Sequence, residues 1–90
     1  MLVRRHVYYS GTVQGVGFRY TARNCAHGAG VTGFVRNLSD GRVEIVVESD
    51  ADGVAGFLVA VAREMGEYIR DTQVLEEEPT GEFRGFGVAF

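Results

Sequence analysis

Two strand-like runs on either side of Asp40-Gly41 limit the fold of this chain more than any other feature. In the run from Arg42 to Glu48, apolar residues at positions 43, 45 and 47 alternate with charged residues, and the run from Val31 to Leu38 precedes the turn. Alternation with a period of two is typical of a strand with one buried face. An Asp-Gly pair between two such runs is typical of a hairpin. We therefore predict a β-hairpin over residues 31–48.

Strand and helix patterns also flank this hairpin. The run from Arg4 to Ser10 is rich in β-branched and aromatic residues and predicts a strand. Apolar or small residues with helical spacing predict a helix that starts at Phe18 and ends at Gly28 or Gly30: Phe18, Ala22, Cys25, Ala26 and Ala29. A second helical stripe, capped by Asp50 or Asp52 and ended by Gly66, consists of Val54, Phe57, Leu58, Val61, Ala62 and Met65. Two further strands are predicted at Thr72–Glu77 and Phe83–Phe90, with a turn between them.

The order of these elements predicts the fold class. Strand, helix, strand, strand, helix and strand follow one another, with a possible fifth strand at the end of the chain. Each helix has a single apolar face, so both should cover the same side of one mostly antiparallel sheet. We expect an α+β fold, a ferredoxin-like βαββαβ sandwich, with residues 1–90 forming one domain.

The composition excludes several kinds of site. Cys25 is the only cysteine and all nine basic residues are arginines, which leaves no disulfide, no cysteine-rich zinc site and no lysine for Schiff-base chemistry. The net charge of −3 disfavours nucleic acid as a partner. No segment approaches about 20 consecutive apolar residues, so no membrane partner is expected. We expect a monomer in the reducing environment of the cytoplasm.

The stretch GTVQGVGFRY, from Gly11 to Tyr20, connects the first strand to the first helix. A glycine-rich loop before a helix N-terminus gathers backbone N–H groups and positive potential, which suits an anion. Arg19 falls in the first helical turn, where a cation opposes the helix dipole unless an anion lies beside it. The loop is no Walker A motif, because it lacks the Gly-Lys-Ser/Thr ending. On this stretch alone, an ordinary turn and a phosphate or carboxylate site both remain open.

A second stretch, GFVRN, ends the first strand of the predicted hairpin at Asn37. Asparagine is common at such positions simply because it tolerates turn geometry. The alternative is a side-chain amide that orients a water molecule beside whatever the glycine loop binds. Both interpretations fit the residues.

Together the two stretches resemble the two signatures of the acylphosphatase family. Val13–Arg19 (VQGVGFR) resembles the first, Gly33–Val43 (GFVRNLSDGRV) resembles the second, and the similarity extends over the whole chain. The family hydrolyses the carboxyl–phosphate bond of acyl phosphates without a metal or cofactor. The resemblance implies that Arg19 binds the phosphoryl group and that Asn37 positions the attacking water. It also implies a loop whose backbone amides hold the phosphate: Gln14, Gly15, Val16, Gly17, Phe18 and Arg19.

Two positions depart from the family pattern. Tyr9 stands where an aliphatic residue usually ends the strand, and Ser49 stands where a glycine usually follows the third strand. Tyr9 is therefore expected to affect packing under the loop, and Ser49 to affect a turn that needs positive φ. The alternative function is a non-catalytic, anion-binding regulatory module of the same fold. RNA binding ranks below both, because the basic and aromatic strand signature is missing.

Overall fold

The predicted hairpin forms the inner part of a five-stranded sheet. The computed structural model describes residues 1–90, and in it β2 (Thr32–Asn37) pairs antiparallel with β3 (Val43–Ser49), with Asn37 opposite Val43. β1 (Val3–Gly11) pairs antiparallel with both β3 and β4 (Ile69–Glu77). β5 (Phe86–Val88) runs parallel to β2, so the sheet order is β4-β1-β3-β2-β5. β3 is thus the central strand, with β1 on one side and β2 on the other.

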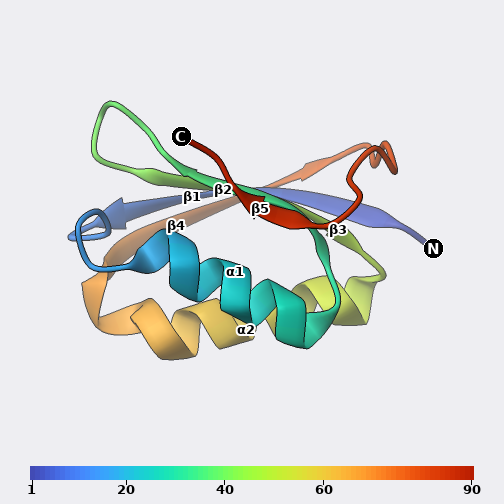
Figure 1. Ribbon diagram of the computed structural model, residues 1–90, viewed down its shortest axis with the longest axis horizontal. Coiled ribbons are helices and arrows are strands. Elements are labelled where there is room, and N and C mark those ends of the chain that lie inside the picture. The colour runs from blue at the N-terminus through green and yellow to red at the C-terminus, as the bar shows by residue number, and fades with distance from the viewer.

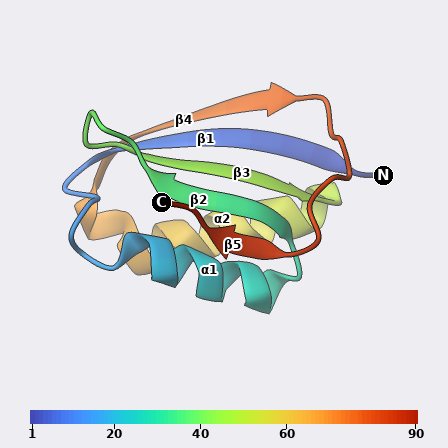
Figure 2. The same ribbon diagram turned by 45° about the horizontal axis from the view of Figure 1, so that its top comes forward.

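Both helices lie on one face of this sheet, as Figures 1 and 2 show. α1 (Phe18–Ala29) ends at Gly30, whose φ of 69° is left-handed and whose N–H donates to Ala26. α2 (Ala51–Met65) begins at Asp50, whose carboxylate accepts a 2.6 Å hydrogen bond from the N–H of Gly53. A short 3₁₀ turn, η1 (Gly66–Tyr68), then leads into β4. Gly30 rather than Gly28, and Asp50 rather than Asp52, therefore cap the helices, and the predicted α+β class is confirmed.

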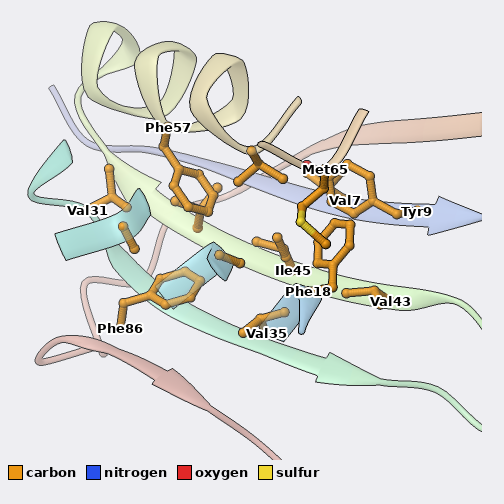
Figure 3. Close-up of a cluster of buried hydrophobic side chains, with 14 of the residues drawn as sticks. Val7, Tyr9, Phe18, Val31, Val35, Val43, Ile45, Phe57, Met65 and Phe86 are labelled. Carbon is orange, nitrogen blue, oxygen red and sulfur yellow. The ribbon is translucent and has the colours of Figure 1, made fainter. Parts of the chain in front are cut away.

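The core fills the space between the helices and the sheet (Figure 3). Tyr9 at the end of β1 is buried, and its ring lies 5.0 Å from the ring of Phe18, centre to centre. Tyr9 thus packs directly beneath the first residue of α1. Ser49 does not have the positive φ considered above, since every residue with positive φ is a glycine. Neither helix has the length and apolar character needed to cross a membrane.

The last two strands differ most from their predicted bounds. β4 begins at Ile69 rather than Thr72, and β5 spans only residues 86–88 rather than 83–90. The segment before β5 is held by Glu48 of β3, whose carboxylate accepts hydrogen bonds from the N–H groups of Thr80 at 2.8 Å and Gly81 at 3.0 Å. Residues 80 and 81 are bound in this way to Glu48, and they do not belong to a strand of the sheet. Alternation along a strand does not reveal an anchor of this kind.

The face of the sheet opposite the helices carries a network of charged side chains. Glu44 and Glu48 both lie on this face and are 5% and 1% exposed. Arg4 pairs with Glu48, while Arg36 and His6 pair with Glu44. Burial tends to raise the pKa of Glu44, but the hydrogen bonds from His6 and Arg36 hold it below its ordinary value. The two carboxylates on this face of the sheet are thus buried and paired.

Candidate active site

The loop between β1 and α1 presents free backbone donors at one end of the sheet. Gly15 and Gly17 both have φ of 78°, a left-handed conformation that is strained for other residues. No hydrogen bond within the protein uses the backbone N–H groups of residues 13–17. The first N–H groups of α1 add to them, because the opening turn of a helix has no internal acceptors for its donors. A loop of free amides beside a helix N-terminus is suited to bind an anion.

The side chain of Gln14 joins this loop to the turn between β2 and β3. Its Nε2 donates to the carbonyl of Leu38 at 2.8 Å and to the carbonyl of Arg42 at 2.9 Å. The same two residues close the turn, since the N–H of Leu38 donates to Arg42 at 2.8 Å. The loop and the turn consequently lie together at one end of the molecule, as Figures 1 and 2 show. The sequence indicated only a backbone role for Gln14, so this contact is a finding of the structure.

Asn37 ends β2 on the face that carries the helices. It lies two residues beyond Val35, which is fully buried in the core, and strand geometry puts both side chains on the same face. The side-chain oxygen of Asn37 is buried and accepts no hydrogen bond from the protein. Buried polar atoms nearly always have a partner. This oxygen is therefore free to accept a hydrogen bond from a bound molecule such as water.

Arg19 extends from the first turn of α1 and contacts the end of the chain. That turn contains no acidic residue, so no side chain there neutralises the guanidinium. Its Nη1 donates to the carbonyl of Ala89 at 3.4 Å, and the guanidinium carbon lies 4.7 Å from the centre of the Phe90 ring. These contacts leave most of its five N–H donors available for an oxyanion.

The loop, Arg19 and Asn37 line one hollow of about 190 Å³. Its walls are Val13, Gly15, Gly17, Phe18, Arg19, Tyr20 and Asn37. Since a water molecule occupies about 30 Å³ of the liquid, the hollow has room for a phosphoryl group and a water. Of the residues predicted for the site, Gln14 and Val16 do not line it. Val13 and Tyr20 line it but were not predicted as site residues. A tyrosine one residue after Arg19 gives no signal in the sequence.

A larger hollow of about 640 Å³ lies beside the start of β1. It is lined by Met1, Leu2, Val3, Arg5, Glu76, Glu77, Glu78 and Pro79. Its one arginine, Arg5, is already paired with Glu76 at 3.1 Å. Three of its eight lining residues are glutamates, which repel an anion, so the smaller hollow is the better candidate site.

The titratable groups of the core take no part in this arrangement. Burial raises the pKa of the Tyr9 hydroxyl, and burial likewise raises the pKa of the Cys25 thiol. Both groups stay neutral at ordinary pH, and Cys25 packs against the core as predicted. No three His, Cys, Asp or Glu side chains gather where they could hold a metal ion. The chemistry available in the hollow is anion binding by amides and guanidinium, with water held by an amide.

Comparisons with known proteins match nearly the whole chain to one family. The sequence model of the family described as Acylphosphatase matches residues 5–88. A protein named acylphosphatase from Roseiflexus sp. (strain RS-1) is 44% identical over 88 residues, which cover 97% of this chain and 95% of the relative. The crystal structure of acylphosphatase from Bacillus subtilis is 30% identical, covers the full length of both chains and superposes with a TM-score of 0.88. A structure of full-length HypF in a phosphate- and nucleotide-bound form is 31% identical and superposes with a TM-score of 0.85. The match covers all of this chain and 12% of the HypF chain.

Proposed function

The chain belongs to the acylphosphatase family, and on that premise we propose which of its residues carry out the hydrolysis of acyl phosphates. The reaction splits the bond between a carboxyl group and a phosphoryl group, and gives a carboxylate and inorganic phosphate. In the proposal, Arg19 and the backbone amides of residues 14–19 bind the phosphoryl group, and Asn37 positions the attacking water. The observation that carries it is the shared hollow, which Asn37, Arg19 and the loop glycines line together, with the side-chain oxygen of Asn37 unpaired in the protein.

The phosphoryl group fits the donors of the loop. Phosphoryl transfer through a loose transition state depends on positioning and on neutralising charge on the equatorial oxygens. The unpaired amides of the loop and the guanidinium of Arg19 can position the phosphoryl group and neutralise its oxygens without a change in protonation. Donors of this kind, already fixed in place, need no reorganisation during the reaction.

Asn37 completes the arrangement by holding a water molecule. Its side-chain oxygen accepts a hydrogen bond from the water, which then attacks phosphorus in line with the leaving carboxylate. The bond from water oxygen to phosphorus forms while the bond from phosphorus to the acyl oxygen breaks. The carboxylate is a good leaving group, so no strong base is needed, and the phosphate itself takes the proton from the water. His and Lys are therefore not required near the hollow.

Kinetics of two variants test these roles. Asn37→Ala is expected to lower kcat by about 10²–10³ while inorganic phosphate still inhibits competitively. Arg19→Ala is expected to abolish inhibition by phosphate. Asn24→Ala, which changes an exposed asparagine of α1, and Arg63→Ala, in the last turn of α2, are matched controls and should behave like the wild type. Equal loss of phosphate binding in Asn37→Ala would contradict a water-positioning role, and retained phosphate inhibition in Arg19→Ala would contradict the binding role.

The reaction is proposed to need neither metal nor cofactor. Amides and a guanidinium can neutralise the phosphoryl oxygens that a metal ion neutralises in other enzymes. Hydrolysis of benzoyl phosphate should therefore continue at an unchanged rate in excess EDTA. Loss of activity on chelation, with recovery on adding a divalent metal, would contradict this proposal.

We also propose a cellular compartment, an oligomeric state and a domain organisation for this protein. A single half-buried cysteine is consistent with a reducing cytoplasm, which we propose as the location. One core of 16 buried residues supports residues 1–90 as one acylphosphatase-like domain. We propose that this domain works as a monomer. Sedimentation of the purified chain tests the monomer, and a dimer at micromolar concentration would contradict it.

A further inference from the structure

One apolar side chain at the hollow remains exposed to solvent. Three apolar residues line the hollow, and two of them belong to the core: Val13 is 0% exposed and Phe18 is 2% exposed. Tyr20 is 47% exposed. Of the large apolar side chains on the protein surface, Tyr20 and Phe90 alone are aromatic, and the ring of Phe90 already packs on Arg19. Of these two exposed rings, that of Tyr20 belongs to a residue that lines the hollow.

Arg23 holds the ring of Tyr20 from one side. Its guanidinium carbon lies 5.2 Å from the centre of that ring, within the range of a cation–π contact. Arg23 lies one helical turn beyond Arg19 in α1, and its Nε is buried without a hydrogen-bond partner. The contact with Tyr20 is the one cation–π contact of this guanidinium. It limits the positions that the ring can take beside the hollow.

We propose that Tyr20 forms the acyl-group subsite of the enzyme and favours acyl phosphates with an aromatic or bulky apolar acyl group. This inference rests on the proposed function, because it takes the phosphoryl group to lie in the hollow. With the phosphoryl group held by Arg19 and the loop amides, the acyl group must lie against another part of the lining, and Tyr20 is the exposed apolar residue of that lining. There the acyl group meets the ring of Tyr20, and an aromatic acyl group gains a ring–ring contact that an acetyl group cannot make.

Paired substrates and two variants of Tyr20 test the subsite. For Tyr20→Ala, kcat/KM for benzoyl phosphate should fall about tenfold while kcat/KM for acetyl phosphate changes less than about twofold. Tyr20→Phe keeps the ring and should retain the wild-type preference. Inhibition by inorganic phosphate should be the same in all three proteins. An unchanged ratio of the two substrates in Tyr20→Ala, or an equal loss with both, would overturn the proposal.

A binding measurement separates this proposal from the proposed function. Calorimetry with phosphate-saturated protein should give an affinity for benzoate that falls about tenfold in Tyr20→Ala and is unchanged in Tyr20→Phe. Acetate, which offers no ring, serves as the control ligand. Because this experiment needs no turnover, it decides on the subsite even if neither substrate is hydrolysed. Equal benzoate affinity in wild type and Tyr20→Ala would overturn the subsite.

Discussion

The guanidinium of Arg19 lies against the ring of Phe90, 4.7 Å from its centre, although the two residues are at opposite ends of the chain. The parallel pairing of β5 with β2 makes this contact possible. The hydrogen bonding between the two strands continues one residue past β5, where the N–H of Ala89 donates to the carbonyl of Val35 at 2.8 Å. The carbonyl of Ala89 in turn accepts from Arg19. The orientation of the proposed phosphate-binding arginine therefore depends on the segment that follows β5.

Removal of the Phe90 ring should weaken phosphate binding. An exposed cation–π contact is worth about 0.5–1 kcal/mol, so Phe90→Ala should raise the inhibition constant of phosphate and KM about two- to fivefold, with kcat less affected. Phe90→Tyr should retain wild-type values. Phe83→Ala is the matched control, because the ring of Phe83 lies 5.6 Å from the guanidinium of Arg4, away from the hollow. If Phe83→Ala raised KM as much as Phe90→Ala, the rise would come from a general loss of stability and not from the lost contact with Arg19.

Loss of the Gln14 side chain should separate the loop from the β2–β3 turn. Gln14→Ala removes two hydrogen bonds, to Leu38 and Arg42, each worth about 0.5–1.5 kcal/mol. The variant should unfold at a lower temperature and bind phosphate more weakly, because the amides of the loop are then less well fixed. Thermal unfolding and phosphate inhibition measure the two effects. Gln73→Ala, on an exposed position of β4, is a control that should change neither.

Local sequence patterns predicted the elements of the fold and, through two motifs, five of the seven residues that line the hollow. Alternation around Asp40-Gly41 identified the hairpin, and the glycine loop with Arg19 indicated a candidate anion site, because both signals lie within a few adjacent residues. The contacts of Gln14, Phe90 and Glu48 were not predictable in this way. Each joins residues that are 24 or more positions apart, and only the folded sheet brings them together.

The two glycines of the loop should resist substitution because of their backbone conformation. At both Gly15 and Gly17 an added Cβ would meet no atom within 4 Å, so space is not the obstacle. The φ of 78° is the obstacle, and alanine at either position should cost about 1–2 kcal/mol in the free energy of unfolding or shift the loop and weaken phosphate binding.

A helical glycine provides the control for this prediction. Gly56 in α2 also has open space around its Cβ position but no positive φ. Gly56→Ala should therefore stabilise the protein by about 0.5–1 kcal/mol and leave phosphate inhibition unchanged. Urea unfolding and phosphate inhibition of the three variants check both expectations. Wild-type stability and inhibition in Gly15→Ala and Gly17→Ala would show that the loop does not need the left-handed conformation.

Glu48 should make the stability of the fold depend on pH. Burial tends to raise the pKa of this carboxyl, but hydrogen bonds from the N–H groups of Thr80 and Gly81 and from Arg4 hold it below its ordinary value of 4.5. A carboxyl whose pKa is lower in the folded than in the unfolded protein stabilises the fold above the unfolded pKa. That contribution is lost as the pH falls through the folded value, so the free energy of unfolding should decrease below about pH 4.5.

Glu48→Gln separates this contribution from those of the other carboxyl groups. The variant cannot ionise at this position, so it should be less stable by about 1.5–3 kcal/mol at neutral pH and should lose less stability than the wild type on acidification. Glu44 and Glu77 also have lowered pKa values, so the free energy of unfolding of the variant should still fall in part on acidification. Glu67→Gln, at an exposed residue of η1 that forms no ion pair, is the control and should follow the wild-type curve. An acid dependence in Glu48→Gln as steep as that of the wild type would show that the anchoring of residues 80 and 81 does not need the charge.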